Sequence, residues 1–233
     1  QAHLDSATAV RLRLVGLAET NYPADRDNNR ALSDISENAL PDNFDVHAAR
    51  EGMQADLVAM LRPLQEGSKT CGIGWLGGGR LAPESARREH GYSVSAVAPC
   101  GPLTLAHEIG HNLGLAHDRE TATQQNGSLR YGAFPFSFGY RQDGPPAFAT
   151  VMAYDVGDQV WINRFSHPGT ELCAGTGCGV TVAVKAKGTP ARRPIGEGYL
   201  LATTAGEEGL QLTLERLGPG DRQVVRNDLP PAS

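Results

Sequence analysis

The sequence predicts a mixed α/β (α+β) protein that contains both strands and helices. Tyr92–Ala98 and Arg11–Leu17 (RLRLVGL) alternate polar and apolar residues, a pattern typical of strands with one buried face. Gly101 and Pro102 open a helical segment that reaches about Leu113, because proline is tolerated at the first position of a helix. The chain has 233 residues, of which 40% are hydrophobic, enough for one large domain or two small ones.

The composition of the other segments indicates further helices and one ambiguous stretch. Ala31–Leu61 is mostly helical in composition and is interrupted near Pro41, but its last part, Ala55–Leu61 (ADLVAML), fits a buried strand equally well. Gly198–Leu217 spaces several leucines nearly as a helix does. We expect the tail, Gly218–Ser233, which contains three prolines, to be flexible.

Charge and hydropathy exclude two classes of protein. The net charge of −5 argues against nucleic-acid binding, which needs a basic surface. No stretch approaches the roughly 18 uninterrupted apolar residues that a membrane-spanning helix needs. The chain begins at Gln1 and shows no charged-then-apolar leader, so we expect a processed chain or a fragment. Separately, we expect the protein to be a monomer.

Four cysteines favour two disulfides and therefore a secreted, extracellular protein. Cys173 and Cys178 enclose four residues rich in glycine, which favours a local bridge and leaves Cys71 to pair with Cys100. Four cysteines allow three connectivities, and four reduced cysteines in a cytosolic protein are the alternative interpretation. Closing the longer loop would stabilise the fold by ~3–4 kcal/mol if the gain comes from chain entropy.

Three histidines lie within the segment HEIGHNLGLAH, which fits the pattern HExxHxxGxxH. On a helix, His107 and His111 share one face, and Glu108 can reach a water beside an ion that they hold. Gly114 can adopt a positive φ and end the helix, which allows His117 to reach the same ion. Three histidines leave one position open, as in catalytic zinc sites. The alternative is a helix with solvent-facing histidines.

The segment from His107 to His117 resembles the zinc signature of the metzincin metalloproteases. Metzincins also carry a Met-turn, and VMAY at Val151–Tyr154 fits that turn. The resemblance implies that Met152 forms an apolar floor under the three imidazoles, whereas alone it would be an ordinary core methionine. Tyr154 stands where some relatives place a tyrosine that contacts the zinc or the oxyanion; packing is the alternative role.

Further motifs resemble the reprolysin-like (adamalysin-like) metzincins, and above all the bacterial secreted peptidyl-Asp metalloproteases. Asp118 follows the third histidine, as in that group, and its expected role is to orient the turn or a ligand rather than to act in catalysis. The similarity is strong over residues 70–168. The motifs that carry it are CGIGWL, YSVSAVAPC, AHEIGHNLGLAHD, FGYR, VMAYD and RFSHP.

This resemblance implies a metzincin-like α/β (α+β) fold with a twisted mixed sheet, an antiparallel edge strand and an active-site helix under the sheet. A smaller, irregular C-terminal subdomain ending in a helix would follow. We therefore expect one catalytic domain over residues 1–217, with an upper part (1–117) and a lower part (118–217), before the tail. Only ten residues precede RLRLVGL, so the first strand and helix of the family are expected to be missing.

The function implied is a zinc-dependent endopeptidase in which Glu108 is the general base and His107, His111 and His117 bind Zn²⁺. Protein or peptide substrates would pair with the edge strand at Ile73, Gly74, Trp75 and Leu76. Arg164, with Arg141 in reserve, would favour an acidic side chain after the scissile bond, or would be an ordinary surface arginine. A binding protein on an inactive protease scaffold and a zinc amidohydrolase are the alternatives; the retained Glu108 argues against the first.

Overall fold

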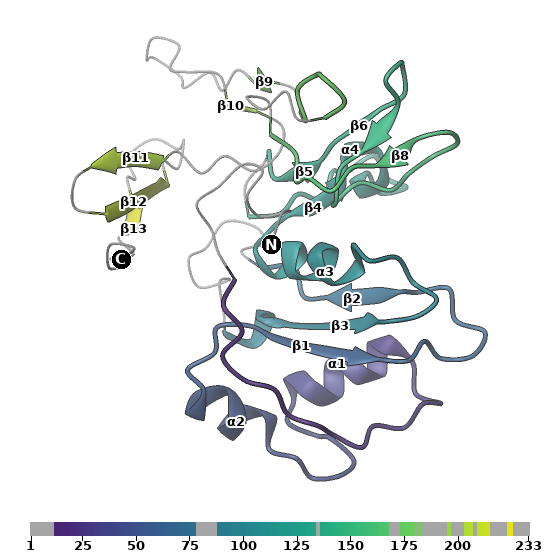
Figure 1. Cartoon of the computed structure of the whole chain (residues 1–233), viewed down its shortest axis with the longest axis vertical. Helices are drawn as coiled ribbons and strands as arrows, with labels where there is room; N and C mark the ends of the chain where they lie inside the picture. The colour runs from purple at the N-terminus through teal and green to yellow at the C-terminus, as the bar shows by residue number, and fades with distance from the viewer. Residues whose placement is uncertain are drawn as a thin grey trace. The chain divides into compact units, whose positions relative to one another are not determined.

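The computed structural model describes residues 12–77, 88–133, 136–167 and 173–179, and the backbone of five short strands beyond residue 180. The chain divides into two units (Figure 1). The sheet unit comprises Arg13–Ala116 and Ala122–Pro135, and the turn unit comprises Gln1–Leu12, His117–Thr121 and Phe136–Ser233. No described helix is long and apolar enough to cross a membrane.

The sheet unit is built on three strands, β1 (Val58–Arg62), β2 (Gly72–Gly74) and β3 (Tyr92–Ala96), in the order β1-β3-β2. β1 runs parallel to β3, and β2 runs antiparallel to β3 at the edge of this sheet. Of the two readings left open for Ala55–Leu61, the strand is the one observed. The sheet is therefore mixed, with an antiparallel edge strand.

Two helices, α1 (Asn28–Ser36) and α2 (Val46–Gly52), precede the first strand, with the predicted interruption near Pro41 between them. Asp27 and Asp45 cap their first turns by accepting hydrogen bonds from backbone N–H groups. The apolar stripe of α1 packs against alternate residues of β3. Together they form the main core, which contains Leu32, Ile35, Tyr92 and Val94.

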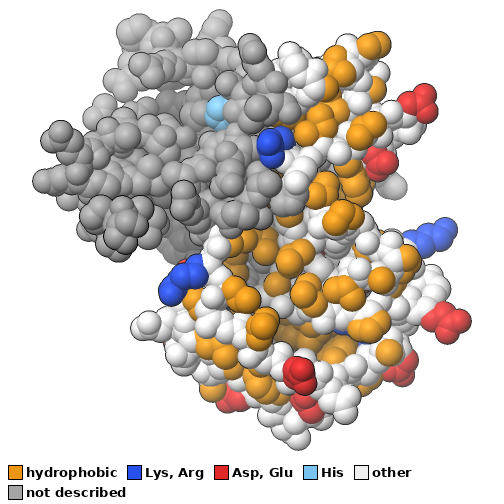
Figure 2. Space-filling view, in the orientation of Figure 1, with side chains coloured by type: hydrophobic (Ala, Val, Ile, Leu, Met, Phe, Trp, Pro, Cys, Tyr) orange, Lys and Arg blue, Asp and Glu red, His pale blue; other side chains and the backbone are white. Residues whose placement is uncertain are grey.

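Residues 12–17 do not form the strand that their alternation predicts, and Arg11 lies outside the described residues. Leu14 and Leu17 are 75% and 83% exposed. Alternation marks a strand only where a neighbouring strand supplies hydrogen-bond partners, and the described part of the chain shows this segment with no ladder. Figure 2 shows hydrophobic side chains at many places on the described surface.

The helix α3 (Thr104–Asn112) follows β3 and a loop, and a 3-10 turn, η3 (Arg88–His90), precedes β3. The predicted helix is confirmed, but Pro102 lies before its first residue rather than at it. α3 packs against β3 and β2, and therefore against the edge of the sheet.

Among its described residues, the turn unit contains short strands and one short helix, α4 (Arg119–Ala122), which begins in it. β4 (Ala116–Asp118) pairs with β5 (Phe138–Gly139), whereas β7 lies between β6 and β8 in a second small sheet. The bounds of these three strands are Arg141–Gln142 for β6, Phe148–Ala149 for β7 and Val160–Trp161 for β8. Phe148 packs with Cys173 and Cys178, which form a disulfide.

The helix predicted over Gly198–Leu217 is wrong. β11 (Thr203–Gly206) and β12 (Gly209–Leu214) form an antiparallel pair there, and Leu217 lies outside the described residues. The leucines of LQLTL alternate with polar residues, a period of two that fits a strand better than a helix. β13 (Gln223–Val225), which lies inside the segment expected to be a flexible tail, pairs with β12. β9 (Thr181–Val182) and β10 (Ile195–Gly196) form another pair.

Candidate metal centre

Helix α3 carries three of the predicted site residues, His107, Glu108 and His111. His107 and His111 are one helical turn apart, and their ring centroids lie 4.7 Å apart in an edge-to-face arrangement. The hydrogen-bonded backbone of the helix fixes this spacing, because residues i and i+4 lie on the same face.

The helix ends at Asn112, and Gly114 makes the turn that stops it, as the sequence predicts. Gly114 has φ +87°, and its N–H donates to His111 O, while Leu115 N–H donates to Gly110 O. These two bonds are the Schellman pattern, in which glycine takes the left-handed position. A Cβ at Gly114 would also lie 2.6 Å from the Cβ of Ala133, so packing and conformation both require glycine there.

The sharp turn after α3 also orients one imidazole. His111 Nδ1 lies 2.8 Å from Leu115 O, a carbonyl that can only accept a hydrogen bond, so Nδ1 carries the proton. Nε2 then holds the lone pair that a metal ion requires. This is the second contact that metal-binding histidines usually make.

His107, His111 and His117 each offer one nitrogen, and these three atoms lie within 4.8 Å of one another. The group could hold a metal ion, and its chemistry fits zinc, which three neutral imidazoles bind with one position left open. The orientation of His111 supports that fit. The metal-ligand histidines predicted from the sequence are therefore brought together.

Glu108 is buried at 5% exposure between α3 and the edge strand. Its carboxyl group occupies the space above Gly72: a Cβ there would meet Oε1 first and would lie 2.7 and 2.8 Å from Cγ and Cδ. At Gly74, a Cβ would lie 3.0 Å from Glu108 O. Burial raises the pKa of Glu108 to about 8. The two glycines of β2 thus let α3 approach closely enough to bring Glu108 over the strand.

The edge strand presents alternate backbone groups away from β3. Ala96 N–H donates to Cys71 O, and Trp75 N–H donates to Tyr92 O. The backbone N–H and C=O groups of Cys71, Ile73 and Trp75 therefore point toward β3. In an antiparallel ladder the intervening residues point their N–H and C=O groups outward. Gly72 and Gly74 are those residues.

Asn112 joins the end of this strand to helix α3. Its Nδ2 lies 2.9 Å from Trp75 O, 2.9 Å from Tyr92 O and 3.0 Å from His90 O. The Trp75 indole N–H also donates to Ser36 Oγ on α1 at 2.7 Å. Trp75 is thereby tied to both helices that pack on the sheet.

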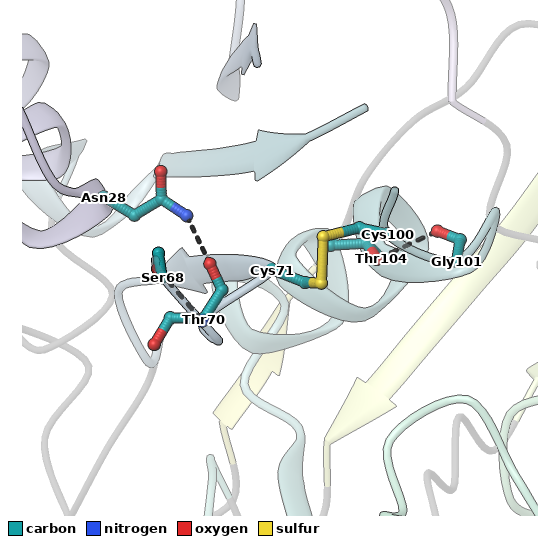
Figure 3. The surroundings of a disulfide bond; sticks show 7 residues. All are labelled: Asn28, Ser68, Thr70, Cys71, Cys100, Gly101 and Thr104. Carbon is teal, nitrogen blue, oxygen red and sulfur yellow. Dashed lines mark hydrogen bonds between the residues drawn. A yellow bond between two sulfur atoms is a disulfide. The ribbon is translucent and has the colours of Figure 1, made fainter. Parts of the chain in front are cut away.

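A disulfide ties the start of the edge strand to the loop before α3 (Figure 3). Cys71 and Cys100 are bonded with their Cα atoms 5.6 Å apart, and this is the predicted pairing, as is Cys173–Cys178. Beside it, Asn28 donates to Thr70 O at 2.8 Å. β2 is therefore fixed at one end by the disulfide and at the other by Asn112.

In the turn unit, the predicted Met-turn is a tight turn in which Ala153 N–H donates to Thr150 O. Met152 is buried at 1% exposure. Gly139 on β5 allows the close approach of this turn, since a Cβ there would lie 2.6 Å from Ala153 N. The turn is thus held by backbone packing as well as by its own hydrogen bond.

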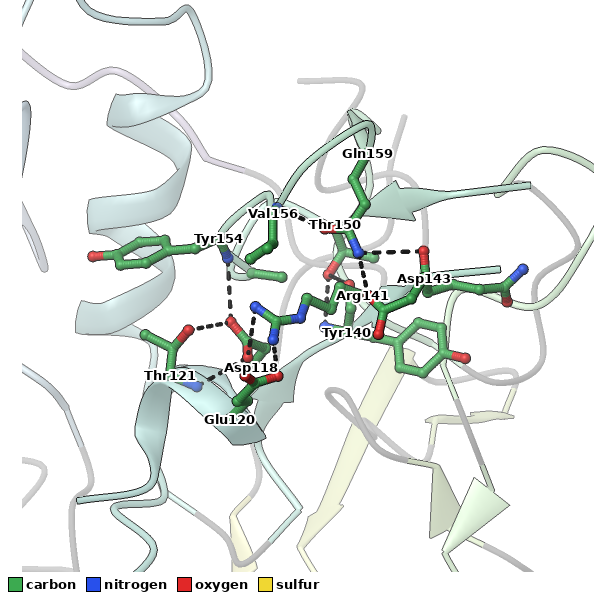
Figure 4. A network of polar contacts seen from close by, with 12 residues as sticks. Asp118, Glu120, Thr121, Tyr140, Arg141, Asp143, Thr150, Tyr154, Val156 and Gln159 are labelled. Atoms are coloured by element: carbon green, nitrogen blue, oxygen red, sulfur yellow. Dashed lines mark hydrogen bonds and ion pairs between the residues drawn. The ribbon is translucent and has the colours of Figure 1, made fainter. Parts of the chain in front are cut away.

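Asp118 connects the residue after His117 to the Met-turn (Figure 4). Its carboxylate accepts hydrogen bonds from Tyr154 N–H at 3.2 Å and from Thr121 N–H and Oγ1 at 3.0 and 2.7 Å. Arg141 lies 3.6 Å from it and also binds Glu120. The geometry agrees with the orienting role expected for Asp118.

A comparison of the sequence with known families decides the family. Residues 2–183 match the family described as "Metallo-peptidase family M12B Reprolysin-like". The chain belongs to the reprolysin-like metallopeptidases.

A curated relative of this reprolysin-like chain is "Peptidyl-Asp metalloendopeptidase" of Pseudomonas aeruginosa, which is 38% identical over 122 residues. The match covers 47% of this chain and 19% of the relative, so the chain spans about a fifth of that protein's length. A solved chain in "Structure of a chaperone-substrate complex" matches 68% of this chain and 22% of its own length, with 24% identity and a TM-score of 0.45. That structural likeness carries no argument.

In the reprolysin-like chain, two of the remaining predicted residues have contacts inside the turn unit. The Tyr154 ring lies 4.5 Å from that of His117, centroid to centroid, and is 46% exposed. Arg164 donates from Nη1 to Asn163 O, and its carbonyl accepts from Val151 N–H at the Met-turn.

Three features that shape the site were not predicted from the sequence. They are the space that Gly72 leaves for Glu108, the hydrogen bonds of Asn112 and the ion pair between Arg141 and Asp118. The Gly-x-Gly spacing of β2 could have indicated that something packs on one face of that strand. No local pattern points to the Asn112 bonds or to the Arg141 pair, because both join segments that are distant in sequence.

Proposed function

We propose that this chain is the catalytic part of a secreted zinc-dependent metalloendopeptidase that hydrolyses extended polypeptides. The observation that carries this proposal is the His107, His111 and His117 group with Glu108 buried beside it on α3. Family membership supports the reaction class. Protein or peptide substrates and a monomeric state are parts of the same proposal.

His107, His111 and His117 would hold Zn²⁺, which supplies a Lewis acid for the scissile carbonyl and for the attacking water. Met152 would provide the apolar floor of the site. The Tyr154 ring packs against the His117 ring at a tilt of 41°, which supports a packing role for Tyr154 rather than a direct contact with the metal or the oxyanion.

Glu108 would take a proton from the attacking water and later give it to the leaving amine. Its burial supports the first of these steps, because a carboxyl group whose pKa is raised to about 8 accepts a proton from water more readily than an exposed carboxylate does. A nearby cation would lower that pKa and favour the carboxylate form.

The substrate backbone would add a strand to β2. Within the segment predicted to bind substrate, the outward-facing groups of Gly74 support pairing there. Those of Gly72 extend the contact by two residues, whereas the backbone of Ile73 and Trp75 faces β3. Leu76 follows in the same outward register.

Cleavage on the amino side of Asp is the finer part of the proposal. Arg141 already pairs with Asp118 and Glu120, which favours Arg164 as the cation that would receive a substrate carboxylate. In a peptide library, Arg164→Ala should lose Asp-directed cleavage while keeping zinc. A preference for Leu or Phe after the cut in the wild type would reject the acidic pocket.

The whole proposal is tested by casein or gelatin cleavage with and without a chelator, together with metal analysis of the purified protein. We expect close to one zinc per chain and loss of cleavage on chelation that added zinc restores. Cleavage that persists without metal would reject the mechanism. One bound zinc without cleavage of any protein would point to a binding protein or an amidohydrolase.

A further inference from the structure

Two serines on β3 bury hydroxyl groups that find no hydrogen-bond partner among the described residues. Ser93 and Ser95 are 0% and 2% exposed. A buried hydroxyl without a partner costs folding free energy, and each such group in a native protein needs an explanation. Alanine would fill nearly the same space without that cost.

The strand register places the two serines beside different parts of Glu108. Ser95 lies directly opposite Gly72, and Ser93 lies opposite Gly74. Directly opposite residues point to the same face of a sheet, which here is the face that packs against α3. The carboxyl group of Glu108 fills the space above Gly72, whereas above Gly74 the nearest atom is the backbone oxygen of Glu108.

We propose that Ser95 is a positioning residue for Glu108, an inference that rests on the proposed function. Its hydroxyl donates a hydrogen bond to one carboxylate oxygen, which leaves the other oxygen to act on the attacking water. Facing side chains in such a pair have Cβ atoms about 4.5–5.5 Å apart, and the carboxyl group occupies the Cβ place of Gly72. Rotation about the Cα–Cβ bond of Ser95 then swings Oγ toward Glu108.

On this buried face, the Ser95 hydroxyl can fix the orientation of the Glu108 carboxylate. A general base works best when its reactive oxygen has one orientation. In the closely packed space between α3 and β2, a protein hydroxyl can hold one carboxylate oxygen of Glu108 in a fixed direction. A serine hydroxyl rotates freely, and it can serve Glu108 both before and after proton transfer because it can donate and accept.

The competing explanation is that both serines are present only because small side chains let α3 approach the sheet. Under that explanation the two positions are equivalent, since both are buried, both face α3 and neither hydroxyl has a partner among the residues that the structure describes. Ser93 is therefore a matched control for Ser95.

The test compares the zinc-loaded 233-residue wild type with Ser95→Ala, Ser95→Thr and Ser93→Ala in steady-state peptide cleavage. We expect kcat of Ser95→Ala to fall roughly 10-fold, as for loss of one hydrogen bond to a charged group, with KM and zinc content unchanged. Ser95→Thr, which keeps the hydroxyl, should recover most of kcat, and Ser93→Ala should match the wild type.

An infrared measurement tests the contact without relying on activity. The carboxylate band that disappears in Glu108→Gln should shift in Ser95→Ala and stay in place in Ser93→Ala. Equal kcat values and an unshifted band in both alanine variants would overturn the inference. A wild type without chelator-sensitive cleavage would overturn the proposed function, while the band shift would still decide whether Ser95 contacts Glu108.

Discussion

Asp34 and Glu108 are both buried carboxyl groups of the sheet unit, on helices that pack against the same strand, yet their surroundings differ. Burial alone would raise the pKa of Asp34, but hydrogen bonds from Tyr22, Arg26 and Arg30 outweigh it and lower that pKa. Burial raises the pKa of Glu108 to about 8 with no such compensation.

This difference separates a structural carboxylate from a reactive one. The Asp34 carboxylate accepts hydrogen bonds from Tyr22 Oη at 2.8 Å and from Arg26 Nη1 at 2.7 Å. Its negative charge therefore stabilises the loop before α1. Glu108 instead lies over two glycines of the edge strand, where its negative charge costs folding free energy in the absence of a metal ion. Groups that cost stability in this way are candidates for function.

Among variants that keep Glu108 itself, the largest expected effect on cleavage is at Gly72, which provides the space for the Glu108 carboxyl group. Gly72→Ala should reduce peptide cleavage roughly 100-fold, because its Cβ would displace the carboxyl group. Zinc content should stay near one equivalent, since no histidine is touched. Gly144→Ala, where a Cβ meets no atom within 4 Å, is the control and should cleave like the wild type. Normal activity in Gly72→Ala would contradict the placement of Glu108.

The next effect concerns the structural carboxylate. Asp34→Ala should lower the free energy of unfolding by ~2 kcal/mol, because it leaves Tyr22 and two arginines without their acceptor. Urea denaturation of the metal-free protein would measure it. A change below ~0.5 kcal/mol, the usual size for a neutral surface substitution, would show that the Asp34 contacts do not stabilise the fold.

The two carboxyl groups predict opposite pH dependences of stability in the metal-free protein. The pKa of Asp34 is lowered, so its contribution is present above its unfolded pKa and is lost as the pH falls below it. The pKa of Glu108 is raised, so the folded state keeps its proton longer, and stability falls as the pH rises from about 4.5 to about 8.

Urea denaturation of metal-free wild type and Glu108→Gln at pH 5, 6, 7 and 8 would isolate the Glu108 contribution, because Asp34, whose pKa is lowered, stays ionised throughout this range. The wild type should lose more than ~1 kcal/mol relative to Glu108→Gln across this range. Parallel pH profiles for the two proteins would mean that Glu108 titrates normally and that its surroundings do not resemble the buried site described above.

The sequence predicted that the three histidines lie close together, and it could do so because their pattern is local. The spacing of His107, His111 and His117 and the positive φ of Gly114 both follow from helix geometry over eleven residues. The surroundings of Glu108 could not be predicted in this way. They depend on Gly72, which lies on the edge strand β2 and approaches Glu108 only after α3 has packed on the sheet.

The predictions that failed share a physical reason. Residues 12–17 alternate like a strand but lack a paired neighbour among the described residues. The helix prediction for Gly198–Leu217 rests on widely spaced leucines. In both segments a short hydrophobic pattern was compatible with more than one backbone conformation. Tertiary pairing then decided the outcome.

The most direct test of the central claim is Glu108→Gln, which removes the proposed general base and preserves the size of the side chain. Zinc content should remain close to one equivalent, and peptide cleavage should fall by at least ~100-fold, the lower limit typical of general acid–base catalysis. Cleavage near the wild-type rate, with zinc still bound, would contradict the account, because another group would then have to activate the water.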